Sequence, residues 1–370
     1  MQLFSNPFLT LPENIVKPEI FPVSINPFEV HPGVPFRKIY SFLKQGKSVC
    51  LTGTYGFALG FYSWLKKQND NNFPVKDYQS SRANREALRL LNKNLLIGVY
   101  QHYTNLENAP DNAWLKVLYP QQDEFLIRFS DFLGMNGAWQ WYSKGIQFPT
   151  LNEKVHPFYG VYFPTRHEHL ALFDSWLAKN TGFTKAIDIG TGCGVLALMM
   201  LKHGIPFVHA TDVNPNAVYS AKCEVLRRNF QDKTVIEQAS LTGSVVAGKN
   251  DLIVFNPPWI PAQTETEMDA ATYYEPGFFE AAFDQIDASS VPGSTLVMLF
   301  SNFAQVAGIS NEHPIEEEVQ NKTRFLLIEN LEAPVMQAPS SRKSWLSTIR
   351  QQEKVELWIM KKNGDSNGEK

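Results

Sequence analysis

The sequence lacks the features that mark secreted, membrane-embedded or nucleic-acid-coating proteins. Only three of its 370 residues are cysteines (Cys50, Cys193 and Cys223), and their spacing matches neither a disulfide framework nor a metal site. No apolar run reaches the ~18 residues that a membrane-spanning helix needs, and no basic segment followed by an apolar stretch opens the chain. The formal net charge of −3 provides no overall basic field for nucleic acid. These absences predict a cytoplasmic protein with no membrane partner and no bound metal.

The pattern along the chain predicts two domains. Residues 1–36 are rich in proline and aromatic residues and are expected to form an extended segment packed on the rest of the protein. Residues 37–135 are interpreted as mostly helical, with an amphipathic helix at 82–96. We therefore expect a mostly helical N-terminal domain over residues 1–145 that selects the substrate.

A second domain is expected over residues 146–362. A hairpin at about residues 138–165, where aromatic and polar residues alternate between glycine and proline breakers, should connect the two domains. The polar residues 363–370 are expected to form a flexible tail.

From about residue 166, short apolar runs alternate with helical patterns, which is typical of an α/β fold. Seven runs are predicted strands: 185–189, 207–213, 234–239, 251–255, 295–301, 325–331 and 355–360. Helices are expected at 167–179, from 194 onward, at 215–229 and at 278–286. Seven strands suffice for a doubly wound, Rossmann-like sheet, which binds its ligands at the carboxyl ends of the strands.

A glycine-rich turn, Asp188-Ile-Gly-Thr-Gly-Cys-Gly194, follows the first of these strands. Glycines there let a ligand approach the backbone. The spacing is not that of a dinucleotide fold, because Val195 stands where the third glycine would be. Asp188 would repel a pyrophosphate but suit an ammonium group, and Asp212, after the second strand, can accept from ribose hydroxyls. These features favour S-adenosylmethionine over NAD as the cofactor.

The fourth strand runs directly into Asn256-Pro-Pro-Trp259. Neither proline can donate to a sheet ladder and each fixes its own φ, so the chain makes a stiff bend at the strand's carboxyl end. The bend presents an amide, rigid carbonyls and an indole ring. Together these groups can hold a flat NH2 group.

In this order and spacing, the motifs resemble those of class I S-adenosylmethionine-dependent methyltransferases. The resemblance covers roughly residues 158–360 and is strongest to the branch whose fourth strand ends in Asp/Asn-Pro-Pro-aromatic. That branch includes release-factor glutamine N5-methyltransferases and adenine N6- and guanine N2-methyltransferases of RNA and DNA. The resemblance implies a domain of the "methyltransferase small" type.

The resemblance also implies roles for individual residues. The implied cofactor-binding residues are Asp188, Gly190, Thr191, Gly192, Gly194, Asp212, Ser240, Leu241 and Asn256. The implied catalytic residues are Asn256, Pro257 and Trp259. Asn256 and the Pro257 carbonyl would accept hydrogen bonds from the substrate nitrogen, and Trp259 would stack on the planar group.

Two departures separate the chain from the glutamine-methylating subgroup. Before the core, Pro164-Thr-Arg-His-Glu-His169 replaces the subgroup's Pro-Arg-Pro-Glu-Thr-Glu, and Trp259 replaces the usual tyrosine. Release-factor specificity therefore does not transfer to this chain. The His-Glu-His run at 167–169 is interpreted as polar helix surface, because residues two apart on a helix point in different directions.

The predicted function is N-methylation of a planar NH2 group, either a protein glutamine or an exocyclic amine of an RNA or DNA base. The alternatives are a small-molecule methyltransferase, which a closed, aromatic-rich N-terminal domain would favour, and a non-catalytic S-adenosylmethionine-binding module. An acidic loop with Glu265, Glu267 and Asp269 follows the bend. We expect this loop to cover the substrate, where its negative charge would disfavour a phosphate backbone.

Overall fold

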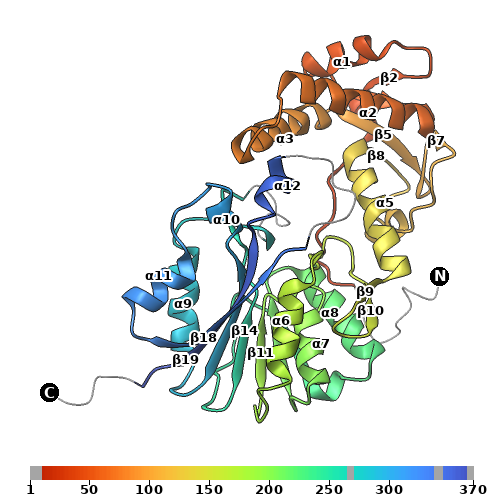
Figure 1. Ribbon diagram of the computed structural model, residues 1–370. Coiled ribbons are helices and arrows are strands. Elements are labelled where there is room, and N and C mark those ends of the chain that lie inside the picture. Colours follow the sequence, from red (N-terminus) through yellow and green to blue (C-terminus); the bar gives the residue numbers. More distant parts are fainter. Residues whose placement is uncertain (1–10, 265–270, 337–344, 365–370) are drawn as a thin grey trace. The chain divides into compact units, whose positions relative to one another are not determined.

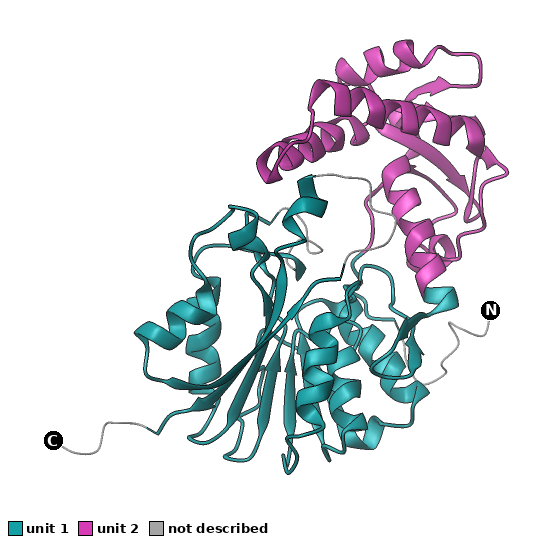
Figure 2. Cartoon of the chain, in the orientation of Figure 1, with its two compact units in different colours: residues 1–16, 142–370 teal, residues 17–141 magenta. Residues whose placement is uncertain are grey.

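The computed structural model describes residues 11–264, 271–336 and 345–364. The chain forms two compact units: one comprises residues 17–141, and the other comprises Met1–Val16 together with Tyr142–Lys370 (Figure 2). The chain therefore crosses between the units twice, whereas the sequence predicted one boundary near residue 145. The loop that holds Glu265, Glu267 and Asp269 lies outside the described residues.

Hydrogen bonds explain why the N-terminal segment belongs with the larger unit. The Val16 N–H donates to Asn216 Oδ1 (2.9 Å), and Asn216 Nδ2 donates to the Val16 carbonyl (2.7 Å) and the Tyr159 carbonyl (2.7 Å). The Asn216 side chain is completely buried. It therefore joins three segments that are far apart in sequence.

The smaller unit, residues 17–141, is built around a six-stranded sheet in the order β1-β8-β5-β3-β2, with β6 paired to β5 (Figure 1). These strands are β1 (Ile20–Phe21), β2 (Phe28–Val30), β3 (Val49–Leu51), β5 (Leu95–Tyr100), β6 (Tyr103–Thr104) and β8 (Glu124–Arg128). Two further short strands pair with each other: β4 (Gly53–Thr54) and β7 (Leu106–Glu107). The helices are α1 (Phe36–Lys44), α2 (Tyr55–Asn72), α3 (Tyr78–Asn92), α4 (Trp114–Leu118) and α5 (Phe129–Lys144), with a 3-10 turn at Val23–Ile25.

The prediction for this region is corrected in one respect. Helices are prominent, as predicted, but they accompany a sheet that was not predicted. The helix expected at 82–96 ends at Asn92, and Leu95 and Leu96 are buried residues of the central strand β5. Strands of two to six residues are too short to show a period, and a pair of leucines satisfies a helical pattern equally well.

The larger unit contains a seven-stranded sheet in the order β13-β12-β11-β14-β17-β19-β18. The strands are β11 (Ala186–Ile189), β12 (Val208–Asp212), β13 (Thr234–Gln238), β14 (Leu252–Phe255), β17 (Thr295–Ser301), β18 (Phe325–Pro334) and β19 (Lys354–Lys362). The first five are parallel, and β19 is antiparallel to both β17 and β18. Each lies within a few residues of a predicted strand, and the prediction of a mixed α/β fold is confirmed.

Helices cover both faces of this sheet (Figure 1). The helices of the larger unit, in the part of the chain that the structure describes, are α6 (Glu168–Leu177), α7 (Val195–Lys202), α8 (Pro215–Arg227), α9 (Phe278–Ala288), α10 (Phe303–Val306), α11 (Pro314–Asn321) and α12 (Trp345–Ile349). Helices α6, α7 and α8 lie on one face, while α9 and α11 bury apolar side chains against the other. The predicted connecting hairpin is present as β9 (Ile146–Phe148) and β10 (Glu153–Val155). After β14 comes a short parallel pair, β15 (Ile260–Pro261) and β16 (Tyr273–Tyr274). Residues Gln231–Lys233 form a 3-10 turn, η2. In the described part of the chain, no helix has the length and apolar character needed to span a bilayer.

Candidate active site

Three neighbouring parallel strands deliver their following loops to one place. Strand β11 lies between β12 and β14, and its last residue, Ile189, pairs with Thr211 on one side and Phe255 on the other. Because the three strands end level, the loops after them line a common cavity of about 320 Å³. Six of the predicted site residues line it: Gly190, Gly192, Asp212, Ser240, Leu241 and Asn256.

The glycine turn after β11 depends on left-handed backbone conformations. Gly190, Gly192 and Gly194 have φ values of 66°, 55° and 85°. A Cβ on Gly192 would lie 3.0 Å from the Tyr162 carbonyl oxygen, so glycine is required there for space as well as for φ. Gly194 does not line the cavity; it is the N-cap of α7.

Asp188 lies beneath this turn rather than in the cavity wall. It is completely buried, and its Oδ2 accepts from Thr191 Oγ1 (2.7 Å) and the Ala197 N–H (3.0 Å). Its Oδ1 is buried without a hydrogen-bond partner among the described residues. Burial raises the pKa of Asp188 to about 7, because removal from water disfavours the charged form. Thr191 therefore supports Asp188 instead of contributing to the cavity surface.

Asp212 ties the second strand to the glycine turn. Its Oδ2 accepts from the Gly192 N–H (2.9 Å), and its Oδ1 accepts from the Asn214 N–H (2.9 Å). Burial raises the pKa of Asp212 above its ordinary value, while these N–H donors oppose the rise. The Val213 N–H is a third donor to this carboxylate, so about one of its four lone-pair sites is left to accept from a ligand hydroxyl.

The Asn-Pro-Pro bend places its side chains differently from one another. Asn256 lines the cavity, Pro257 is buried, and Trp259 lies outside the cavity wall. The Trp259 indole N–H donates to Asn256 Oδ1 (3.1 Å) and to the Leu299 carbonyl (3.3 Å). Because indole nitrogen can only donate, the amide oxygen of Asn256 must be the atom that faces it.

Sequence reasoning missed several cavity residues. Gly160 and Tyr162 come from the segment after the hairpin, and the Asn214 amide holds that segment by donating to the Gly160 carbonyl (3.0 Å). Phe278, at the start of α9, also lines the cavity. No local motif marked these residues, since their role depends on contacts between distant segments.

The interpretation of residues 167–169 as polar helix surface is wrong for His169. This residue is 1% exposed, and its ring centroid lies 5.3 Å from that of Trp259 in an edge-to-face arrangement. Helix α6 packs against strands β18 and β19, and the His169 side chain lies among Trp259, Phe303 and Glu353. His169 follows His167 and Glu168 in a polar run, so the local sequence gave no signal that its side chain is buried.

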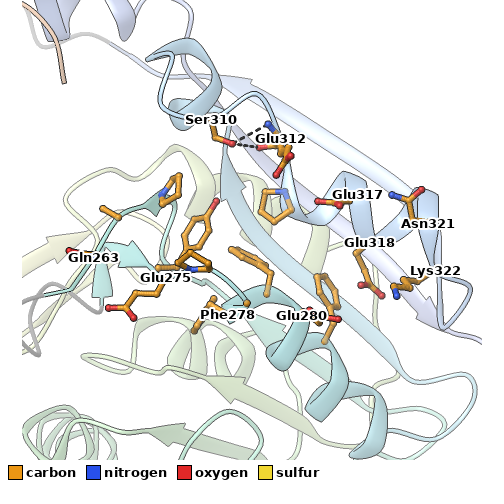
Figure 3. Close-up of a pocket in the computed structure, with 18 residues that line it drawn as sticks. Gln263, Glu275, Phe278, Glu280, Ser310, Glu312, Glu317, Glu318, Asn321 and Lys322 are labelled. Carbon is orange, nitrogen blue, oxygen red and sulfur yellow. Dashed lines mark hydrogen bonds between the residues drawn. The ribbon is translucent and has the colours of Figure 1, made fainter. Parts of the chain in front are cut away.

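A larger groove of about 730 Å³ adjoins the cavity and shares Phe278 with it (Figure 3). Its lining is aromatic in part, with Tyr274, Phe278, Phe279 and Phe283. Four exposed carboxylates also line it: Glu275, Glu280, Glu312 and Glu317. Lys322 is the one basic side chain among the described lining residues, so the groove is net acidic.

Comparison with known proteins identifies the central part of the chain. Residues 171–285 match the family model of the methyltransferase small domain. A release factor glutamine methyltransferase of Deinococcus radiodurans is 33% identical over 143 residues, 35% of this chain and 49% of that protein. A tRNA1(Val) (adenine(37)-N6)-methyltransferase of Trichodesmium erythraeum is 26% identical over 162 residues, 42% of this chain and 63% of that protein. A ribosomal protein L11 methyltransferase of Clostridium perfringens is 33% identical over 138 residues, 32% of this chain and 42% of that protein.

The chain thus spans between 42% and 63% of the length of these relatives. A solved structure of a ribosomal protein L11 methylase from Lactobacillus delbrueckii subsp. bulgaricus aligns over 55% of this chain and 83% of its own. Its sequence identity is 18% and its TM-score is 0.35.

A glycine turn, a carboxylate and an Asn-Pro-Pro bend, delivered by adjacent parallel strands to one cavity, define a class I S-adenosylmethionine-dependent methyltransferase domain. Within that class, residues 171–285 are similar to the methyltransferase small domain family, whose model they match. The resemblance that the motifs predicted is confirmed.

Proposed function

We propose that this chain is an S-adenosylmethionine-dependent N-methyltransferase that acts on a planar NH2 group, and that its larger sheet is of the doubly wound, Rossmann-like type. One observation carries the proposal: Gly190, Gly192, Asp212 and Asn256 line a single cavity at the carboxyl ends of three adjacent parallel strands. This is where open α/β sheets bind their ligands.

The residues present fit the cofactor. Asp188 Oδ1 is a buried acceptor that has no partner among the residues the structure describes, which suits the cofactor's ammonium group. Asp212 suits the ribose hydroxyls, and the backbone at Ser240 and Leu241 suits the adenine. The glycines leave the turn free of side chains, so the methionine part can lie against the backbone.

When bound, S-adenosylmethionine supplies an electrophilic methyl group on a positively charged sulfur. The acceptor nitrogen is a poor nucleophile, because its lone pair is delocalised. An N–H of the acceptor donating to the second lone pair of Asn256 Oδ1 would leave more electron density on that nitrogen and orient it. Catalysis would then rest on positioning and electrostatics, with no strong base.

For the acceptor, the relatives' names point to protein glutamine and to adenine N6. The exposed carboxylates of the adjoining groove favour a protein over a nucleic acid, since a phosphate backbone passing there would be repelled. We assign the selection of the acceptor to residues 17–141.

Two measurements test the proposal. Calorimetry should detect S-adenosylmethionine binding, and Asp212→Ala should weaken that binding by at least tenfold. Asn256→Ala should still bind the cofactor in the same measurement, but its turnover in a methyl-transfer assay should be lost. Labelled cofactor added to a fractionated cell extract should label protein or RNA. Absence of cofactor binding would reject every enzymatic assignment, and label confined to small molecules would show that the acceptor is a small molecule.

A further inference from the structure

Trp259 lines a second pocket, of about 140 Å³, which does not include the glycine turn. We call it the arginine pocket. Its polar and aromatic walls are formed by Tyr162, Arg166, His169, Trp259, Arg350 and Glu353. Tyr162 also lines the cavity at the glycine turn, which we call the cofactor cavity. The two pockets are therefore neighbours in the same unit. The Trp259 N–H reaches Asn256 in the cofactor cavity, which links the arginine pocket to the proposed methyl-transfer site.

Several polar atoms in the arginine pocket are buried without partners. Neither ring nitrogen of His169 makes a hydrogen bond within the described structure, although the residue is only 1% exposed. The Nε of Arg350 is also buried without a hydrogen bond. Arg166 Nη1 lies 3.3 Å from Glu353 Oε2, in an ion pair that does not meet hydrogen-bond geometry. Leaving buried polar groups unpaired destabilises the folded protein, and a bound polar ligand would relieve this cost.

The charges lining the pocket do not balance. Two guanidinium groups, Arg166 and Arg350, face one carboxylate, Glu353, which is 3% exposed. Burial lowers the pKa of Arg350, and the nearby positive charge of Arg166 lowers it further. The second effect arises because the two cations repel each other, and the Glu353 carboxylate acts in the opposite direction.

Glu168 supplies part of the missing negative charge from outside the pocket, because its carboxylate interacts with the Arg166 guanidinium. Glu168, on the same helix as His169, does not line the pocket; it accepts from the Met336 and His167 N–H groups. Burial lowers the pKa of His169 to about 4, so its ring is neutral at physiological pH and offers one N–H donor.

We propose that the arginine pocket binds an anionic group of the methyl acceptor, a carboxylate or a phosphate, between Arg166 and Arg350 with the His169 N–H as a further donor. The acceptor then carries a planar NH2 group at Asn256 and an anion beside Trp259. The link to the acceptor rests on the proposed methyltransferase function, whereas anion binding itself does not.

The test measures thermal unfolding of the full chain in sodium acetate or sodium phosphate against sodium chloride at equal ionic strength. A ligand that binds only the folded state raises the unfolding temperature. We expect acetate, phosphate or both to raise it in the wild type, and Arg350→Gln to abolish the rise. The anion that gives the larger rise in the unfolding temperature identifies the preferred group as a carboxylate or a phosphate. Arg89→Gln, which removes an exposed guanidinium paired with Glu86, should keep the full rise.

Arg350→Lys covers the case in which Arg350→Gln does not fold. It keeps the charge but lacks Nε, and should retain a reduced rise. An equal rise in the wild type and both Arg350 variants would overturn the proposal, because it would reflect a bulk salt effect. No rise with either anion would overturn it as well.

Calorimetry with S-adenosylmethionine on the same variants separates the two proposals. The wild type and Arg350→Gln should bind the cofactor equally. If the wild type failed to bind cofactor but showed the anion effect, the methyltransferase assignment would fall while the anion site stood.

Discussion

The indole N–H of Trp259 determines the orientation of the Asn256 amide, because it donates to the amide oxygen. A stacking role for Trp259 remains a prediction, but the hydrogen bond gives it a second role that a phenyl ring cannot fulfil. The same N–H also donates to the Leu299 carbonyl on β17, so the ring is anchored to the sheet. The orientation of the amide oxygen therefore depends on the residue that replaces the family's usual tyrosine.

Trp259→Phe separates the two roles. It keeps an aromatic face but removes the N–H, at a cost of about 1 kcal/mol in the orientation of Asn256. We expect kcat to fall roughly five- to tenfold while the Kd for S-adenosylmethionine is unchanged. Steady-state kinetics and calorimetry provide the two readouts; an unaltered kcat would leave stacking as the only role of the ring.

Asp188 makes the stability of the cofactor-free protein depend on pH. Its pKa is about 7 in the folded state, against an ordinary value of 3.8. Between these values the folded chain holds a proton that the unfolded chain has released, so the free energy of unfolding falls as pH rises. Asp188→Asn should remove this fall.

We therefore expect the variant to gain stability relative to the wild type between pH 5 and pH 8, by on the order of 1–3 kcal/mol. Denaturant unfolding at the two pH values measures the difference. The exposed Asp232, changed to asparagine, is the control and should show no such gain. A constant difference between Asp188→Asn and wild type across this range would contradict the argument.

Among the elements, the glycine turn lies against the segment around Tyr162. A Cβ on Gly192 would make a tight contact with the Tyr162 carbonyl oxygen at 3.0 Å, whereas Gly204, after α7, has a similarly left-handed φ of 84° and open space around it. The two glycines thus share the backbone constraint but not the steric one.

Gly192→Ala and Gly204→Ala form a matched pair. Both should lose about 1 kcal/mol of stability, because alanine is strained at positive φ. Only Gly192→Ala should also weaken S-adenosylmethionine binding, by at least tenfold, since the turn and the Tyr162 segment must separate. Equal cofactor affinities in the two variants would show that the contact does not shape the site.

The elements also show what a sequence can reveal. Strands such as 251–255 were predictable because a buried parallel strand is a continuous apolar run that ends at a breaker. The glycine turn and Asp212 were predictable because their chemistry is local. Tyr162 and His169 were not, since the first joins the site through a contact between distant segments and the second lies among side chains from distant segments.

The charge of the whole molecule gives no support to a phosphate backbone at the groove, where Lys322 is the single basic side chain among the described lining residues. The four exposed glutamates there lie beside the proposed methyl-transfer site, and the net charge of the chain is −3 (Figure 3). Nonspecific nucleic-acid binding depends on phosphate neutralisation by Lys and Arg. The groove should therefore exclude RNA.

Charge reversal in the groove tests this exclusion. Fluorescence anisotropy with labelled single-stranded RNA at ~150 mM salt should show no saturable binding for the wild type. Glu280→Lys combined with Glu317→Lys should introduce binding without changing cofactor affinity. If the wild type already bound the RNA with a steep salt dependence, the preference for a protein acceptor would be wrong.

The bonds between Val16 and Asn216 constrain the order in which the chain is made and folded. Residue 16 is synthesised 200 residues before its partner, which at about 5–20 residues per second is an interval of roughly 10–40 s. Residues 17–141 are complete within that interval and have a sheet of their own. The larger unit is thus the last to close, and Val16 cannot form these bonds until α8 has emerged from the ribosome.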